Sequence, residues 1–80
     1  MKTVIVTGAC GGIGRAAVDA FRAADWTVIG VDRGDRPTDL DTDDFIRADL
    51  STRDGVALVR RELAHIDRLD ALVNNAAVQI

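Results

Sequence analysis

The sequence predicts an α/β protein in which helices cover a parallel sheet. Short apolar runs rich in β-branched residues alternate with segments whose apolar residues recur at helical spacing, in the order β-α-β-β-α-β. Parallel neighbours need crossover connections, and these are right-handed, so we expect the helices on the faces of the sheet. With 80 residues and no internal repeat, the chain is expected to be one domain or part of one.

The first strand is expected at residues 3–7 (TVIVT), where every internal residue is apolar, as in a strand covered on both faces. A helix is predicted from Gly12 to about Asp25, because apolar residues recur along one side of it. These residues are Ile13, Ala17, Phe21 and Ala24. A second apolar run at residues 26–32 predicts the next strand, and a polar loop follows it.

Residues 45–50 (FIRADL) predict a short third strand. Ser51 and Asp54 resemble a capping box, so a second helix is expected to begin there and to extend to about residue 66. Its apolar stripe consists of Val56, Val59, Leu63 and Ile66. The fourth strand is predicted at residues 71–74.

Composition and charge exclude several classes of protein. The net charge is −3, and 48% of the residues are apolar, as in soluble globular proteins. No apolar run approaches the roughly 20 residues of a membrane span, and strand-like residues from Thr3 leave no room for a signal peptide, so we expect a cytoplasmic protein. Few aromatic residues and no basic cluster speak against nucleic acid. One cysteine and one histidine are too few for an internal disulfide or a structural zinc site.

Glycines crowd the junction between the first strand and the first helix, in the segment VTGACGGIG. The first turn of a helix presents unpaired N–H groups and a partial positive charge, which suit a phosphate. Gly8 permits a turn that a side chain would forbid, Gly12 lets an anion approach the backbone, and Gly14 allows close packing of helix on strand. The bare backbone therefore predicts a cradle for a pyrophosphate.

Asp32 adds a second feature of a dinucleotide site. It ends the predicted second strand roughly 18 positions after Gly14, close to the spacing at which an acid accepts hydrogen bonds from the adenosine ribose. The other strands also end in polar or small residues, along the edge where open α/β sheets bind ligands. We therefore predict a partial Rossmann-type sheet with strand order 3-2-1-4. Two plainer interpretations stay open: the glycines form an ordinary loop, and Asp32 starts a turn.

Three motifs in order, TGACGGIG, ADL and LVNNAA, resemble the short-chain dehydrogenase/reductase family over the whole chain. That family carries TGxxxGxG, an Asp followed by an apolar residue, and NNAG at these places. The resemblance implies four residues along the pyrophosphate, Gly8, Gly12, Ile13 and Gly14. It implies that Asp32 binds the adenosine ribose, and that Asp49 and the Leu50 backbone meet the adenine edge. Asn75 and Ala76 would lie beside the cofactor ribose, with Asn74 chiefly structural.

Two departures from the family pattern affect this interpretation. Ala77 stands where the family most often has the glycine of NNAG. Gly8, Gly11 and Gly14 also satisfy GxxGxxG, the spacing of the nucleotide-sugar epimerase-like branch. NNAA favours the dehydrogenase branch, because the epimerase-like branch usually places a histidine in that segment.

The resemblance also implies where catalysis takes place. The catalytic Ser, Tyr and Lys of the family come after the strand at which this sequence stops, and the chain has no tyrosine and a single lysine, Lys2. His65 is expected to be a surface residue and Cys10 a small loop filler. We therefore expect no catalytic residue in the chain, which would be inactive alone. Residues 1–80 would form the N-terminal part of one dinucleotide-binding domain in a longer enzyme.

The expected function is that of an NAD(H)-dependent oxidoreductase, which moves hydride between nicotinamide and an alcohol or carbonyl substrate. A non-catalytic dinucleotide-binding module is the alternative from another class. NAD is expected rather than NADP, because Asp32 places a carboxylate where the 2′-phosphate would sit. Arg33 is compatible with either cofactor, whereas Gly11 lacks the basic residue that NADP-preferring relatives often carry. The full-length enzyme is expected to be a homo-oligomer, and the isolated chain, with one sheet edge bare, to self-associate.

Overall fold

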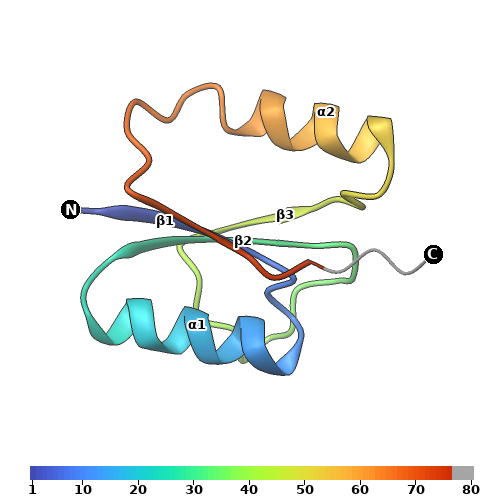
Figure 1. The fold of residues 1–80 in the computed structure, drawn as a ribbon. Helices are drawn as coiled ribbons and strands as arrows, with labels where there is room; N and C mark the ends of the chain where they lie inside the picture. Colours follow the sequence, from blue (N-terminus) through green and yellow to red (C-terminus); the bar gives the residue numbers. More distant parts are fainter. Residues whose placement is uncertain (77–80) are drawn as a thin grey trace.

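The computed structural model describes residues 1–76, so the predicted departure at Ala77 lies outside the described residues. Its elements are β1 Thr3–Thr7, α1 Gly12–Ala23, β2 Thr27–Asp32, β3 Asp44–Arg47, α2 Arg53–Glu62 and β4 Ala71–Asn74. All neighbouring strands are parallel, in the order β3-β2-β1-β4. The two helices lie on opposite faces of the sheet (Figure 1). The predicted fold class and strand order are confirmed.

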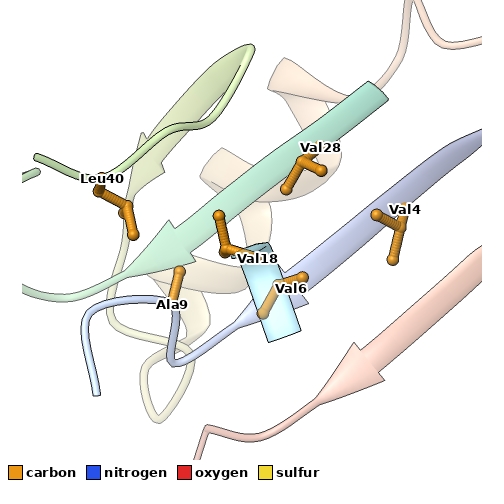
Figure 2. Close-up of a cluster of buried hydrophobic side chains, with 6 residues drawn as sticks. All are labelled: Val4, Val6, Ala9, Val18, Val28 and Leu40. Atoms are coloured by element: carbon orange, nitrogen blue, oxygen red, sulfur yellow. The ribbon is translucent and has the colours of Figure 1, made fainter. Parts of the chain in front are cut away.

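The core on the α1 side of the sheet is built from alternate residues of the central strands. Val4 and Val6 of β1, Val28 of β2 and the fully buried Val18 of α1 form one cluster, together with Ala9 (Figure 2). Leu40, from the loop between β2 and β3, completes this cluster. The long loop therefore covers part of the face beside α1.

The core on the α2 side uses the intervening residues of the same strands. Ile5, Ile29, Val31 and Ile46 are buried there, and Leu58, Val59, Leu63 and Ile66 pack against them from α2 and the segment after it. Because β1 and β2 are buried on both faces, their sequences are continuous apolar runs, as a parallel sheet between helices requires.

The first helix ends at Ala23 rather than near Asp25, because Asp25 adopts a left-handed backbone conformation with φ 64°. The Asp25 N–H donates to the Arg22 carbonyl (3.0 Å), and the Trp26 N–H donates to the Phe21 carbonyl (3.0 Å), which is the Schellman arrangement. The Phe21 and Trp26 rings pack edge to face with centroids 4.8 Å apart. Trp26 therefore belongs to the helix end, and β2 begins at Thr27 instead of residue 26.

Both predicted helix stripes are partly wrong. In α1, Ile13 is 74% exposed and Ala24 is exposed, whereas Val18, outside the stripe, is fully buried. In α2, Val56 is 41% exposed, whereas Leu58, outside the stripe, packs against the core together with Val59. Ile13 and Val56 lie in the first turns of their helices, and Ala24 follows the end of α1, so these side chains meet less of the core.

The third strand is shorter than predicted, and the cap of α2 lies one residue later. β3 ends at Arg47 because β2 ends at Asp32, whose carbonyl takes the Ala48 N–H (2.8 Å). Thr52, not Ser51, is the N-cap, since its hydroxyl accepts the Gly55 N–H at 3.0 Å. The helix ends at Glu62, with Leu63 as its C-cap, rather than near residue 66.

Three ion pairs hold the loop between β2 and β3 against α1. Arg15 pairs with Asp39 (2.6 Å), and Arg22 pairs with Asp43 (2.7 Å) and Asp41 (3.4 Å). The Asp43 carboxylate also accepts the Val28 N–H at 2.7 Å. The bonds of Asp43 to Val28 and Arg22 fix the end of the loop beside the amino end of β2.

The edge of the sheet at β4 is exposed, and for this reason we expect the isolated 80-residue chain to self-associate. Leu72 is 59% exposed although its register partner Ile5 is buried on the α2 side. We expect sedimentation equilibrium to show an apparent mass that rises with concentration, and Leu72→Lys to reduce it, because a charge on an edge strand opposes pairing between sheets. A wild-type monomer that melts cooperatively above about 65 °C would contradict this expectation.

Asp70 joins the beginnings of β1 and β4 and is expected to give stability a pH dependence. Its carboxylate accepts the Thr3 N–H (2.8 Å) and the Arg68 Nε–H (2.7 Å), and the Thr3 bond first, then Arg68, holds its pKa below the ordinary 3.8. A lowered folded-state pKa means stability that is complete above the unfolded-state pKa and lost as pH falls through the folded one. Asp70→Asn is therefore expected to be less stable at neutral pH and to lose less stability on acidification.

Urea unfolding of wild type and Asp70→Asn from about pH 6 to about pH 3 tests this. Asp67→Asn, an exposed acid with no hydrogen bond or ion pair among residues 1–76, serves as the control. Parallel stability curves for wild type and Asp70→Asn across that range would rule out the proposed contribution.

Candidate functional site

A cleft of about 600 Å³ lies at the carboxyl edge of the sheet. Here β1 has neighbours on both sides, and the connections from β1 and β3 cross opposite faces, as expected of a topological switch point. Of the residues predicted for the site, those that line the cleft are Gly8, Asp32, Asp49, Leu50, Asn75 and Ala76. Gly12, Ile13 and Gly14 are not among its lining residues, and belong to the first turn of α1.

The turn after β1 depends on two glycines. Gly8 has φ 64°, a conformation that side chains disfavour, and a Cβ there would lie 3.1 Å from Nδ2 of Asn75. A Cβ on Gly14 would overlap the Gly8 carbonyl oxygen, so only glycine lets α1 begin directly against the turn. The turn predicted at Gly8 is confirmed, and Gly14 allows close packing of α1 as predicted, although against the turn after β1 rather than against the strand.

The amino end of α1 is open toward a ligand. Its N-cap residue, Gly11, supplies no side-chain hydrogen bond, and no acidic residue lies in the first turn. A Cβ on Gly12 would meet nothing within 4 Å. The N-terminus of α2 differs, because Thr52 caps it and Asp54 lies in its first turn. The first turn of α1 therefore keeps its N–H groups and partial positive charge available for an anion.

Asp32 joins the glycine turn to the end of β2. One carboxylate oxygen accepts the Cys10 N–H (2.9 Å) and the other accepts the Gly34 N–H (2.9 Å). The bond to Gly34 makes Asp32 the start of a turn, so this plainer interpretation is correct as far as it goes. Each oxygen retains capacity for a further hydrogen bond, so Asp32 can also accept hydroxyl donors in the cleft.

Cys10 lines the cleft beside Asp32. Burial, followed by the nearby Asp32 carboxylate, raises the pKa of its thiol, and Sγ contacts the Asp35 carbonyl oxygen at 3.7 Å. A raised pKa disfavours the thiolate, which is the nucleophilic form. The interpretation of Cys10 as a small loop filler stays a prediction.

Thr7 organises the end of β4 and was not singled out from the sequence. Its buried hydroxyl accepts the N–H groups of Asn75 (2.9 Å) and Ala76 (3.1 Å). The same hydroxyl lies 3.2 Å from Oδ1 of Asn74 and 3.3 Å from the Val73 carbonyl oxygen, to which it can donate. Asn74 thus ties β4 to β1, which confirms its predicted structural role. One hydroxyl therefore holds the two residues after β4 that border the cleft.

The segment after β3 supplies the opposite border of the cleft. Oδ1 of Asp49 accepts both the Ser51 hydroxyl (2.6 Å) and the Ser51 N–H (2.9 Å). These bonds, hydroxyl first, hold the pKa of Asp49 below its ordinary value, and Arg33 contributes. A Cβ on Gly55 would overlap the Asp49 carbonyl oxygen, so α2 begins tightly against this segment. Ser51 lines the cleft and was missed as a site residue, although a serine two residues after an aspartate is a recognisable Asx-turn pattern.

The described part of the chain shows neither a metal site nor a membrane-spanning helix. Residues 1–76 contain no group of three or more histidine, cysteine or acidic side chains placed to hold a metal ion. Neither of the helices in that range has the length and apolar character that a bilayer crossing demands.

Comparison with known proteins places these features in a family. Residues 2–80 match the family described as short chain dehydrogenase. The chain is 39% identical over 77 residues to coniferyl-alcohol dehydrogenase of a Pseudomonas strain, covering 96% of this chain and 29% of that protein. It is 35% identical over 82 residues to the short chain dehydrogenase ple7 of Rhodocybe pseudopiperita, covering 96% and 32%.

Solved structures of similar proteins share the fold. Ligand-free aldohexose dehydrogenase of Thermoplasma acidophilum superposes with a TM-score of 0.80 at 35% identity, over 99% of this chain and 31% of that one. A Brucella ovis oxidoreductase of the same family, in complex with a partially ordered NAD, gives 0.74 at 39% identity, over 99% and 40%. The chain spans about a third of the length of these relatives. By its sequence match and its fold, the chain belongs to the short-chain dehydrogenase/reductase family.

Proposed function

We propose that the chain is the N-terminal, cofactor-binding part of an NAD(H)-dependent oxidoreductase that acts on an alcohol or carbonyl substrate. Residues 1–80 would then be one portion of a single dinucleotide-binding domain. Family membership and the NAD bound to the Brucella ovis relative support this proposal. Its substrate and catalytic groups would belong to the rest of the protein.

The observation that carries the proposal is the open amino end of α1 beside a cleft that contains Asp32. The space above Gly12 and the absence of a cap at Gly11 leave room for a diphosphate at the positive end of the helix. The acceptor oxygens of Asp32 lie at the end of the adjacent strand, where ribose hydroxyls of the same ligand would donate. A dinucleotide contains both an anionic diphosphate and a ribose diol, so it could bind the end of α1 and Asp32 together.

Each residue then has a distinct part in binding. The turn and first helical residues Gly8, Gly12, Ile13 and Gly14 present backbone toward the pyrophosphate, and Asp32 accepts from the adenosine ribose. Asp49 and the Leu50 backbone border the adenine, while Asn75 and Ala76, held by the Thr7 hydroxyl, lie beside the second ribose. The bound nicotinamide supplies hydride transfer. The part of this chain is to bind and orient the cofactor.

Two observations test the proposal together: NADH binding by the full-length gene product, and the sequence that the gene encodes after Ile80. Titration of the full-length gene product with NADH, followed by nicotinamide fluorescence, is expected to show saturable binding. The gene is expected to continue beyond Ile80 and to encode a YxxxK segment roughly 70 residues downstream. Binding without that segment would favour the non-catalytic module, and absence of binding would refute the proposal.

A further inference from the structure

The Asp49 carboxylate is held on one side only. Its Oδ1 receives two donors from the same residue, the Ser51 hydroxyl at 2.6 Å and the Ser51 N–H at 2.9 Å. Among residues 1–76, Oδ2 makes no hydrogen bond and no ion pair, although Asp49 lines the cleft. One oxygen is therefore engaged while the other remains an acceptor for a ligand.

The backbone of Asp49 is also held by hydrogen bonds. Its carbonyl oxygen accepts the Thr52 hydroxyl (2.8 Å) and the Thr52 N–H (3.1 Å), and Gly55 packs against the same carbonyl. Because the main chain of Asp49 is held in this way, the two bonds from Ser51 determine the rotation of the carboxylate. Ser51 therefore controls which oxygen is presented to the cleft.

Register places Asp49 where it meets the base of a bound dinucleotide. Asp32 pairs with Arg47 between β2 and β3, so Asp49 follows two residues beyond that pair on the neighbouring strand. With a ribose at Asp32, the base attached to it extends toward Arg33, Leu50 and Asp49, which line the same cleft. A carboxylate oxygen accepts from an exocyclic amino group, as in adenine, and repels the carbonyl oxygen that a 6-oxo purine carries in its place.

We propose that Ser51 is a positioning residue that sets the Asp49 carboxylate to select an amino purine over a 6-oxo purine in the cleft. This inference rests on the proposed dinucleotide binding. The lowered pKa of Asp49, due first to the Ser51 hydroxyl, agrees with a carboxylate that stays ionised while it accepts.

The test compares the dissociation constants of NAD and nicotinamide hypoxanthine dinucleotide in the full-length protein. Wild type is expected to prefer NAD by about tenfold or more. Ser51→Ala is expected to reduce this preference at least about threefold, and Ser51→Thr, which keeps the hydroxyl, to restore it. Arg53→Ala, an exposed neighbour without a hydrogen bond to Asp49, is the control and keeps the preference.

A second variant gives an independent test, which does not alter Ser51. In Asp49→Asn, the Ser51 N–H requires the amide oxygen and the Ser51 hydroxyl can donate to the same atom, so the amide NH2 faces the cleft and donates to a 6-oxo base. Asp49→Asn is expected to bind the hypoxanthine dinucleotide more tightly than NAD. When Asp49→Asn is combined with Ser51→Ala, this reversed preference is expected to disappear.

The outcomes separate this inference from the proposed function. If wild type binds NAD but Ser51→Ala leaves the preference unchanged, or weakens both ligands equally, Ser51 is merely structural and the inference is overturned. Retained NAD preference in Asp49→Asn would overturn it as well. If wild type binds neither dinucleotide, the proposed function is wrong, and the inference, which rests on it, is wrong as well.

Discussion

Gly14→Ala is expected to lower the free energy of unfolding by about 3 kcal/mol or more and to abolish dinucleotide binding. The new Cβ would overlap the carbonyl oxygen of Gly8 and crowd Cα of Ala9, and both are backbone atoms that cannot rotate away. Relief requires α1 to move off the turn. A domain of this size has a total stability of only several kcal/mol, so this loss is a large part of it.

Gly12→Ala is the matched control, because a Cβ there meets nothing within 4 Å of the protein. Its unfolding free energy is expected to stay within about 0.5 kcal/mol of wild type, since alanine suits the first turn of a helix. NAD affinity is nevertheless expected to fall at least about tenfold, because the methyl group occupies the proposed phosphate space. Urea unfolding and NADH titration measure the two effects separately. Equal stability of Gly14→Ala and wild type would show that the helix is not fixed by this contact.

Asp32→Ala is expected to reduce the ratio of kcat/KM for NAD over that for NADP, by as much as about a thousandfold in the full-length enzyme. The carboxylate and a 2′-phosphate in a partly dry cleft repel by on the order of 1–4 kcal/mol, and the substitution removes this repulsion. It also removes the acceptor for ribose hydroxyls, so NAD affinity falls while NADP affinity rises.

Asp35→Ala separates this local effect from a change in overall charge. Asp35 carries the same charge three residues later, but its side chain is 86% exposed and pairs with Arg47. Screening by solvent makes its contribution small, so the cofactor ratio is expected to change by less than about twofold. If wild type already prefers NADP, or if Asp32→Ala leaves the ratio unchanged, Asp32 does not distinguish the two cofactors.

The periodicity of the sequence was sufficient for the fold but not for the helix faces. The apolar runs in β1 and β2 predicted buried parallel strands, and the strand order followed from right-handed connections. The stripe in α1 included Ile13, because periodicity gives a face only within the range where a neighbour covers the helix, and it passed beside Val18, one position after Ala17. The first turn of α1 lies at the open edge of the sheet, so Ile13 has no such neighbour among residues 1–76.

The choice of helix cap shows the same limit at a single residue. Ser51 and Thr52 are both good capping residues, and the sequence pattern with Asp54 favoured Ser51. In the structure, the Ser51 hydroxyl donates to Asp49, which leaves Thr52 to accept the Gly55 N–H. The Ser51 hydroxyl can either cap the helix or donate to Asp49. The segment after β3 brings the Asp49 carboxylate close to it, and the spacing of the residues does not specify that distance.

The sequence by itself determined the parallel α/β fold, the turn at Gly8 and the place of Asp32 at the sheet edge, because these follow from local conformational limits and from strand and helix periods. Only the tertiary structure decided that the Thr7 hydroxyl holds the end of β4. It also decided that Gly14 and Gly55 are needed against particular carbonyl oxygens. These contacts bring atoms together within hydrogen-bond or van der Waals range, and such distances are set by how the layers pack.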